Sequence, residues 1–268
     1  DEGCKVLNAD DRTFALYSGI STYWTVDYSV QQSFPPATTK SRCAIWAEDI
    51  QSSVTQTKAK IRCNAEDGIP DLVLPMAGTF NVSNALCAIS CVHTAGVSLD
   101  VALEALKSFT GVPGRMERID AGQNFSVFID FTVTPASYEA TLKTARAMLG
   151  DGNRLLVLTG SCGDRMKEKR PLVGKICSEY AHVVVVTNED PYTEDPERII
   201  DEVWAGIDQR KTHAHRISNR KEAIKFIVQE AKPGDIVLLC GKGSDTTMWT
   251  AQGQVLWNEK EIVREILA

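Results

Sequence analysis

The sequence has no excess of positive charge, no long hydrophobic run and no basic-then-apolar leader. Its 268 residues include 29 lysines and arginines against 35 aspartates and glutamates, a net charge of −6. Proteins that wrap nucleic acid are normally basic, so this balance argues against a nucleic-acid partner. No apolar stretch approaches the ~18 residues of a membrane span. We therefore expect a soluble, cytoplasmic protein with no membrane span and no export signal.

Metal-binding and disulfide patterns are missing as well. The eight cysteines show no paired zinc-ligand spacing and are too sparse for a disulfide framework, so we expect reduced thiols. His213 and His215 alternate across an expected edge segment, which is typical of surface histidines. We therefore expect no metal site on this chain. The chain begins at Asp1 and its first methionine is Met76, so we expect the translation start to lie upstream.

The first part of the chain is predicted to be rich in strands. Short or alternating apolar runs are separated by serine, threonine, proline and aspartate clusters, at 5–7, 44–47, 60–63 and 71–74. The pattern becomes helical over 81–94 and again over about 99–109. The turn-forming segment 111–114, Gly-Val-Pro-Gly, then marks the expected domain boundary between residues 111 and 112.

The rest of the chain alternates between strand and helix patterns. Strands are predicted at 126–131, 154–159, 182–187 and 235–240, and helices at 135–149, 171–180, 196–207, 221–231 and 259–267. Strands separated by helices of this length predict an α/β fold with a doubly wound, mostly parallel sheet. A dehydrogenase is disfavoured because no Gly-x-Gly-x-x-Gly opens a helix after a strand.

Unusual polar segments follow three of these strands. The segment 160–170 is cationic and carries glycines, 188–196 is strongly acidic, and 241–245 is glycine-rich with one acid. Ligands bind at the carboxyl ends of the strands in open parallel sheets. A zwitterionic amino acid needs this combination, because a guanidinium pairs with its carboxylate and acidic oxygens pair with its ammonium.

Each segment also has a plain structural interpretation. The basic side chains of 167–170 are consistent with a solvated helix face. Glu194 and Asp195 are suited to the positive end of the following helix, which Asp195 could cap. Gly241-Lys242-Gly243 lacks the spacer of a phosphate loop and is a weak match to one.

Several motifs, taken in order, resemble those of the Mur ligase family. They are Val6-Leu7-Asn8-Ala9-Asp10-Asp11, Met76-Ala77-Gly78-Thr79-Phe80-Asn81-Val82-Ser83-Asn84-Ala85, Pro113-Gly114-Arg115-Met116-Glu117, Ile129-Asp130-Phe131-Thr132-Val133-Thr134-Pro135, Gly163-Asp164-Arg165 with Lys169-Arg170-Pro171, Asp190-Pro191-Tyr192-Thr193-Glu194-Asp195-Pro196 and Gly241-Lys242-Gly243-Ser244-Asp245. The chain is most similar to the MurE type, which adds the third residue of the peptidoglycan stem peptide.

This resemblance implies an ATP-dependent amide ligase. Such an enzyme phosphorylates the carboxylate of UDP-MurNAc-L-Ala-D-Glu with Mg-ATP, and the amine of a free diamino acid attacks the acyl phosphate. It also implies a partial central P-loop-type ATPase domain over 1–111. A Rossmann-like domain that binds the amino acid is implied over 112–268.

The resemblance also assigns roles to individual residues. Nucleotide-binding roles fall to Asn84, to Arg115 for the ribose and phosphates, and to Asp130 for the ribose hydroxyls. Amino-acid-binding roles fall to Arg165 for the carboxylate, to the recognition tetrapeptide Glu189, Asp190, Pro191 and Tyr192, and to Gly241 and Asp245 at the distal end.

Three departures from the family pattern affect the expected substrate. Val133 stands where the family has histidine, and 241–245 lacks the histidine and glutamate of Gly-Lys-Gly-His-Glu. Tyr192 occupies the place of the arginine found in diaminopimelate enzymes, which disfavours binding of a second carboxylate. Since an aspartate suits an ammonium better than asparagine does, Asp190 favours L-lysine or another basic amino acid.

The upstream machinery of the family is not found in the sequence. Nothing between Asp1 and Met76 matches the phosphate loop Gly-x-x-Gly-Lys-[Ser/Thr] or the carbamylated lysine, and the substrate-binding N-terminal domain is missing too. Because phosphoryl transfer depends on positioning by such groups, we expect that this chain alone does not turn over ATP. Two alternatives stay open: a related ligase of another polymer such as pseudopeptidoglycan, or an inactive MurE-like binding or scaffold module, which the two lost histidines favour.

Overall fold

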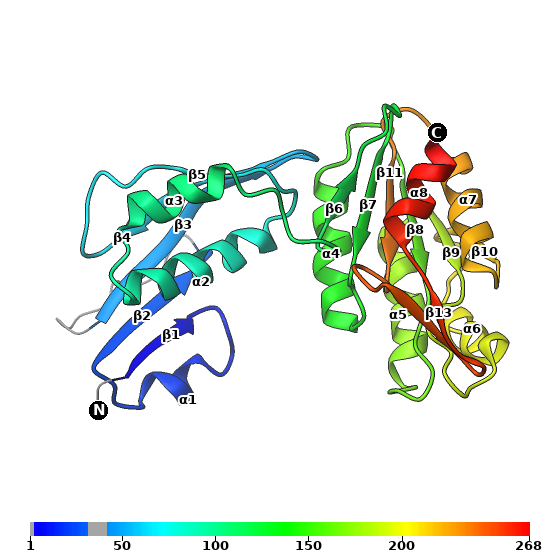
Figure 1. Ribbon diagram of the computed structural model, residues 1–268, viewed down its shortest axis with the longest axis horizontal. Helices are drawn as coiled ribbons and strands as arrows, with labels where there is room; N and C mark the ends of the chain where they lie inside the picture. Colours follow the sequence, from blue (N-terminus) through cyan, green and yellow to red (C-terminus); the bar gives the residue numbers. More distant parts are fainter. Residues whose placement is uncertain (1–2, 32–41) are drawn as a thin grey trace. The chain divides into compact units, whose positions relative to one another are not determined.

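The computed structural model describes residues 3–31 and 42–268 (Figure 1). The chain folds as two compact units, Asp1–Thr110 and Gly111–Ala268, and each is described here by itself. This division lies one residue before the boundary expected from the turn at 111–114. Within the described residues, no helix combines the length and apolar character needed to cross a membrane. All eight cysteines are free thiols, as expected.

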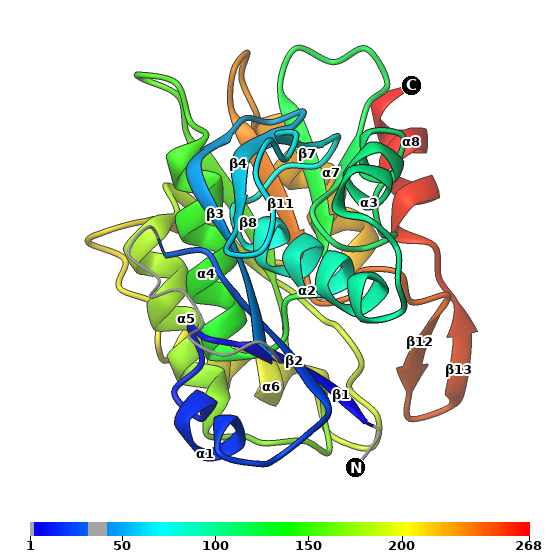
Figure 2. The same cartoon turned by 90° about the vertical axis from the view of Figure 1, so that its left-hand side faces the viewer.

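The first unit is a five-stranded sheet covered by helices. Its strands are β1 (Cys4–Asn8), β2 (Trp24–Ser29), β3 (Arg42–Ser52), β4 (Thr57–Cys63) and β5 (Leu72–Leu74), in that spatial order. The pairs β1–β2 and β2–β3 are parallel, and β3–β4 and β4–β5 are antiparallel. Helices α2 (Phe80–Thr94) and α3 (Leu99–Lys107) pack against each other and against strands of the sheet (Figure 2).

Two elements of this unit were not predicted from the sequence. Helix α1 (Phe14–Ser18) is only one turn long and buries no side chain, so it leaves no periodic apolar pattern. Strand β2 carries the buried Asp27, which pairs with Arg42 and interrupts the apolar alternation expected of a half-buried strand. Strand β4, in contrast, alternates buried and exposed residues along its whole length and was recognised for that reason.

The second unit is a six-stranded sheet in the order β10-β9-β8-β11-β7-β6. The strands are β6 (Glu117–Ile119), β7 (Ser126–Asp130), β8 (Leu155–Thr159), β9 (Val183–Val186), β10 (His213–Arg216) and β11 (Ile236–Cys240). All neighbouring pairs are parallel except β6–β7. The predicted doubly wound, mostly parallel sheet is therefore confirmed, and the two histidines lie on an edge strand.

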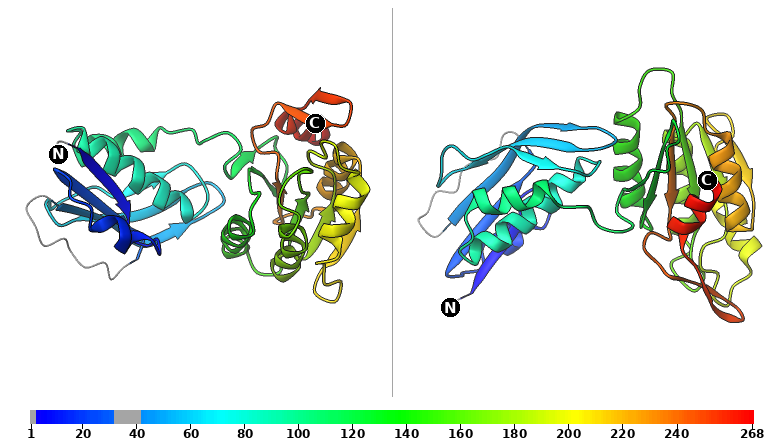
Figure 3. Two further views of the ribbon diagram at one scale, coloured as in Figure 1. Left: turned by 90° about the horizontal axis from the view of Figure 1, so that it is seen from below. Right: turned by 45° about the horizontal axis from the view of Figure 1, so that its top comes forward.

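Helices cover both faces of this sheet (Figure 3). Helices α7 (Arg220–Glu230) and α8 (Glu259–Leu267) pack on one face, where Ile224 and Val263 join a core with Val127, Leu156 and Leu239. Helices α4 (Pro135–Ala147) and α5 (Lys169–Tyr180) pack against each other on the opposite face, and α6 (Pro196–Trp204) packs against α5 and β9. The helix predicted over 196–207 therefore ends three residues early.

A small hairpin beyond the main sheet was missed by the sequence analysis. Strands β12 (Thr247–Thr250) and β13 (Gly253–Leu256) pair in antiparallel fashion after the 241–245 segment. Most of its residues are exposed or half-buried, and only Met248 is buried. Without an apolar alternation the hairpin is not recognisable from its pattern, although it reaches the candidate site.

Candidate functional site

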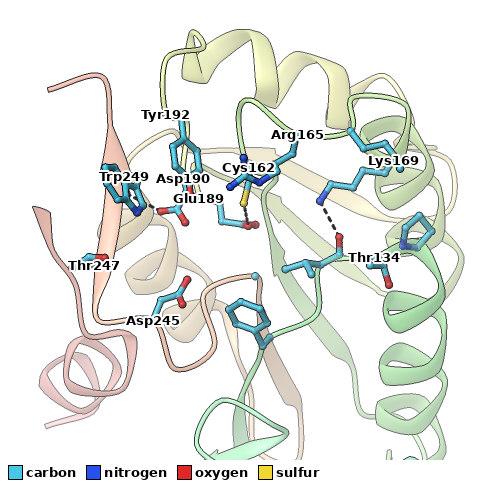
Figure 4. A pocket seen from close by; sticks show the side chains of 15 residues that line it. Thr134, Cys162, Arg165, Lys169, Glu189, Asp190, Tyr192, Asp245, Thr247 and Trp249 are labelled. Atoms are coloured by element: carbon cyan, nitrogen blue, oxygen red, sulfur yellow. Dashed lines mark hydrogen bonds between the residues drawn. The ribbon is translucent and has the colours of Figure 1, made fainter. Parts of the chain in front are cut away.

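A cavity of about 680 Å³ opens at the carboxyl edge of the second sheet (Figure 4). It lies where strands β7, β8, β9 and β11 end, because parallel strands direct their carboxyl ends to one edge. Six of the seven residues expected to bind an amino acid line it: Arg165, Glu189, Asp190, Tyr192, Gly241 and Asp245. The seventh, Pro191, is buried in the same loop and does not line the cavity.

Positive charge lies along one side of the cavity, in the segment that follows β8. Arg165 is exposed and donates a hydrogen bond to the carbonyl of Asp164 at 3.2 Å. Lys169, at the start of α5, donates to the carbonyl of Val133 at 3.0 Å. Among the described residues, neither cation pairs with a carboxylate. Both are therefore available to an anionic group of a ligand.

Acidic residues lie next to this segment and across from it, with Glu189 beside Cys162 and Asp245 farther away (Figure 4). Glu189 is buried, accepts a hydrogen bond from the thiol of Cys162 at 2.9 Å, and has its pKa raised by that burial. Asp245 is half-buried on the loop after β11. The glycine at position 241 allows the Glu189 carboxylate to lie close to the backbone, because a Cβ there would lie 2.3 Å from Glu189 Oε2. The cavity is thus dipolar, as a zwitterionic ligand requires.

Asp190 is already paired within the protein. Lys242 is fully buried, and its ammonium contacts both carboxylate oxygens of Asp190, at 2.9 and 3.0 Å. It also reaches Asp245 at 3.0 Å and the carbonyl of Thr247 at 2.8 Å. Burial alone lowers the pKa of Lys242, but the bonds to Asp190 and Asp245 raise it above the ordinary value. Asp190 therefore has its charge compensated before any ligand binds.

Aromatic side chains form a further part of the wall. Tyr192 stacks on Trp249 with ring centroids 5.6 Å apart and an interplanar angle of 17°. The guanidinium of Arg165 lies over the Tyr192 ring, 5.0 Å from its centroid. Trp249, like Thr247, comes from β12, so the hairpin contributes directly to the cavity.

The two loops that carry these groups are joined by a buried arginine. Arg170 is fully buried and pairs with Glu194 at 3.0 Å and with Glu202 at 2.6 Å. It also donates to the carbonyl of Cys162 at 2.9 Å. Hydrogen bonding by Arg170 lowers the pKa of Glu194 to about 2. The interpretation of 167–170 as a solvated helix face is therefore wrong for Arg170.

Two smaller expectations for these loops have different outcomes. Asp195 caps α6, accepting a hydrogen bond from the Glu197 N–H at 3.0 Å, as expected. Glu194 does not act as a cap, because it binds Arg170 and Lys167. The glycine at 163 is required by packing, since a Cβ there would lie 1.8 Å from the carbonyl oxygen of Pro191.

The residues expected to bind a nucleotide are distributed over both units. Asn84 lies exposed on α2 of the first unit and donates to Asn81 Oδ1 at 3.1 Å. In the second unit, the Arg115 guanidinium lies over the Phe131 ring, 5.2 Å from its centroid. Asp130 is buried and accepts hydrogen bonds from the Met116 N–H at 2.8 Å and from the Thr132 hydroxyl. Burial raises the pKa of Asp130. Its nucleotide role stays a prediction.

Several residues in and behind the cavity wall were not singled out from the sequence. Lys242 was considered only as part of a weak phosphate-loop match, and Lys169 only as part of a basic run. Trp249 and Thr247 belong to the unrecognised hairpin, and Cys162 carried no signal of its own. The position of Lys242 two residues after a buried strand was the one available clue, because such positions reach the ligand-binding edge.

Comparison with known proteins gives a consistent result. A sequence profile described as "Mur ligase, glutamate ligase domain" matches residues 114–243. A UDP-N-acetylmuramoyl-L-alanyl-D-glutamate–2,6-diaminopimelate ligase of Nostoc sp. is 34% identical over 270 aligned residues, covering 99% of this chain and 52% of that protein. A UDP-N-acetylmuramyl-tripeptide synthetase of Roseiflexus sp. is 38% identical over 226 residues, covering 83% of this chain and 44% of that protein.

Structural similarity agrees with the sequence comparison. A solved UDP-N-acetylmuramoyl-L-alanyl-D-glutamate–2,6-diaminopimelate ligase superposes with a TM-score of 0.63 and 27% identity, covering 98% of this chain and 53% of that one. The chain spans about half the length of the curated relatives it matches. Together with the motif order, these comparisons show that residues 114–243 form a Mur ligase C-terminal domain, and that the chain is similar over nearly its whole length to such ligases.

Proposed function

We propose that this chain is part of a MurE-type ligase, which joins a free diamino acid to UDP-MurNAc-L-Ala-D-Glu in an ATP-dependent reaction. The observation that carries the proposal is the dipolar cavity at the ends of β7, β8, β9 and β11. Its two uncompensated cations face buried and half-buried acids across a space large enough for an amino acid. The names of the relatives favour a muramoyl-dipeptide substrate over a pseudopeptidoglycan one.

The side chains of the cavity define how the amino acid is held. Arg165 offers the planar fork that suits the α-carboxylate, and Lys169 adds a second positive charge beside it. The α-ammonium lies toward Glu189, and the terminal ammonium lies toward Asp245. An amine attacks an acyl phosphate only when it is neutral, and Glu189, when ionised, is placed in the cavity wall to take its proton. The chain thus orients the nucleophile of the reaction.

The amino acid that fits best is L-lysine or a close basic relative. Tyr192 provides no positive charge for the second carboxylate of diaminopimelate, and Asp245 adds negative charge at the distal end. Desolvating an unpaired carboxylate against these groups costs binding free energy. The discrimination between the two diamino acids therefore rests on the absence of a cation at position 192.

Isothermal titration calorimetry with the 268-residue chain tests this proposal. We expect L-lysine to bind at least about tenfold more tightly than meso-diaminopimelate, a difference of about 1.4 kcal/mol. L-Lysinamide, which lacks the α-carboxylate, serves as the matched ligand and binds weakly if Arg165 and Lys169 hold that group. The variant Tyr192→Arg shifts the preference toward meso-diaminopimelate. Tighter binding of meso-diaminopimelate by the unaltered chain would contradict the assignment of lysine.

ATP and Mg²⁺ enter the proposal as requirements of the whole enzyme. Among residues 3–31 and 42–268, no three His, Cys, Asp or Glu side chains are grouped so as to hold a metal ion. Asn84, Arg115 and Asp130 are the groups proposed to contact the nucleotide. The cytoplasmic location follows in the proposal from the two nucleotide substrates.

The 268-residue chain is expected to bind its amino acid without turning over ATP. Its sequence contains no phosphate loop, and backbone amides around the β- and γ-phosphates supply most of the positioning in phosphoryl transfer. A coupled phosphate-release assay with Mg-ATP and L-lysine should give no signal above the protein-free rate. An ATPase stimulated by lysine, and lost in Arg165→Ala, would refute this prediction.

A further inference from the structure

A single buried ammonium joins three separate segments of the cavity wall. Lys242 lies on the loop after β11, Asp190 on the loop after β9, and Thr247 at the start of the hairpin. The Lys242 ammonium is within 3.0 Å of an acceptor on each of them. Because Lys242 is fully buried, these bonds replace water entirely and fix the three segments together.

Asp190 accepts three hydrogen bonds in this arrangement. Both of its oxygens accept from Lys242, and Oδ1 also accepts from the Trp249 N–H at 2.9 Å. The residue is only 6% exposed. A ligand ammonium would have to share Asp190 with Lys242, whose charge already compensates that carboxylate. The geometry therefore argues against Asp190 as the ligand of the substrate side chain.

The hairpin is held against the recognition loop by the same contacts. Besides the Trp249 N–H, the Tyr192 N–H donates to the carbonyl of Trp249 at 3.4 Å. Residues two apart on a strand share a face, and both Thr247 and Trp249 line the cavity while Met248 between them is buried. Tyr192 holds the left-handed backbone conformation, with φ of 51°, that brings its ring onto Trp249.

We propose that Trp249, backed by Tyr192, is the specificity-determining surface for the side chain of the bound amino acid, and that Asp190 is a positioning residue which holds Trp249 in place. This inference rests on the proposed function. The ligand class is an amino acid with an aliphatic stem and a terminal ammonium. Trp249 and Asp245 both line the cavity (Figure 4). In the proposed complex, the stem lies along the indole and the terminal ammonium lies at the ring face and at Asp245.

Calorimetry with two matched ligands separates these roles in the 268-residue chain. L-Norleucine has the stem of L-lysine without the ammonium, so the ratio of the two affinities isolates recognition of the charge. In Trp249→Leu we expect lysine affinity to fall about five- to tenfold and norleucine affinity about twofold. Trp249→Phe keeps an aromatic ring, so this variant should retain most of the ratio of lysine affinity to norleucine affinity.

Two further variants act as controls. Leu256→Ala lies on the same hairpin, at a side chain that is 92% exposed, and should leave both affinities unchanged. Asp190→Asn should lower the lysine-to-norleucine affinity ratio as Trp249→Leu does, and should lower it no further in the Trp249→Leu background, because a positioning residue acts only through Trp249. A far-ultraviolet circular dichroism spectrum identical to that of the unaltered chain shows that each variant is folded.

The outcomes distinguish this inference from the function on which it rests. An unchanged lysine-to-norleucine ratio in Trp249→Leu would overturn the role of Trp249. A loss of lysine binding caused by Asp190→Asn that persists in the Trp249→Leu background would show that Asp190 is the ligand after all. If the unaltered chain bound neither amino acid, the proposed function itself would fail, and this inference with it.

Discussion

Lys242 and Asp190 are a buried ion pair whose partners depend on each other. Burying an ammonium is unfavourable unless acceptors surround it, and Lys242 has four such contacts. Removing one partner leaves the other charge buried and uncompensated. This residue pair therefore makes the cavity wall both rigid and sensitive to substitution.

The variant Lys242→Met tests this dependence. We expect the free energy of unfolding to fall by about 3–5 kcal/mol, because Asp190 loses the ammonium that compensates its charge. The double variant Lys242→Met with Asp190→Asn should recover part of that loss. Urea denaturation followed by tryptophan fluorescence gives the values. A double variant no more stable than Lys242→Met would show that the pair is not energetically coupled.

Glu194 and Glu189 predict opposite dependences of stability on pH. Hydrogen bonding from Arg170 lowers the pKa of Glu194 from 4.5 to about 2, so its contribution is present above pH 4.5 and is lost as the pH falls toward 2. The variant Glu194→Gln should therefore be less stable than the unaltered chain at pH 6, with the difference shrinking toward pH 2. Urea midpoints at pH 6, 4 and 3 measure it.

Glu189→Gln provides the comparison of opposite sign. Burial raises the pKa of Glu189, so the protonated form is the one that the fold favours, and stability is lost as the pH rises through that raised value. Glutamine imitates the neutral form, and the variant should gain stability relative to the unaltered chain as the pH rises. If the stability difference from the unaltered chain changed with pH in the same direction for both variants, the opposite pKa shifts of Glu194 and Glu189 would be contradicted.

At the scale of elements, the strand ends and loops were predicted well because their residue types are distinctive. The valine run of β9 and the apolar run of β11 mark buried parallel strands, and the polar segments after them had to meet at one edge. The hairpin and the buried pairing of Lys242 were not predictable, because long-range hydrogen bonds leave no period in a sequence. No pattern in the sequence therefore indicated that Asp190 pairs with Lys242 inside the protein.

The loop at Gly241 has little space for any side chain. Its φ is 106°, and a Cβ there would lie 2.3 Å from a carboxylate oxygen of Glu189. The variant Gly241→Ala should lower stability by about 1–3 kcal/mol and abolish lysine binding, because Glu189 must move. Gly253→Ala is the matched control: its φ is 110°, but no atom lies within 4 Å of the added Cβ.

The comparison between the two glycine variants isolates the clash from backbone strain. Gly253→Ala should lose about 1 kcal/mol for its backbone conformation alone and should bind lysine normally. Thermal unfolding of both variants gives the loss of stability, and calorimetry gives the affinity for lysine. Equal effects of the two substitutions would mean that the approach of Glu189 to Gly241 is unimportant.

At the scale of the whole chain, the two units have separate cores. Buried apolar residues of the first unit run from Val26 to Leu103 in one cluster, and a cluster of the second runs from Ile119 to Val263. Every residue that lines the candidate cavity lies between Phe131 and Trp249. The cavity is therefore built entirely by the second unit.

A chain limited to residues 111–268 should consequently fold by itself and bind L-lysine as tightly as the 268-residue chain, within about twofold. A domain with its own core and sheet retains most of its stability when separated. Circular dichroism tests folding and calorimetry tests binding, with Arg165→Ala in the short chain as the control for specific binding. Folding without binding would mean that the first unit orders the cavity, and the amino-acid site would then belong to both units.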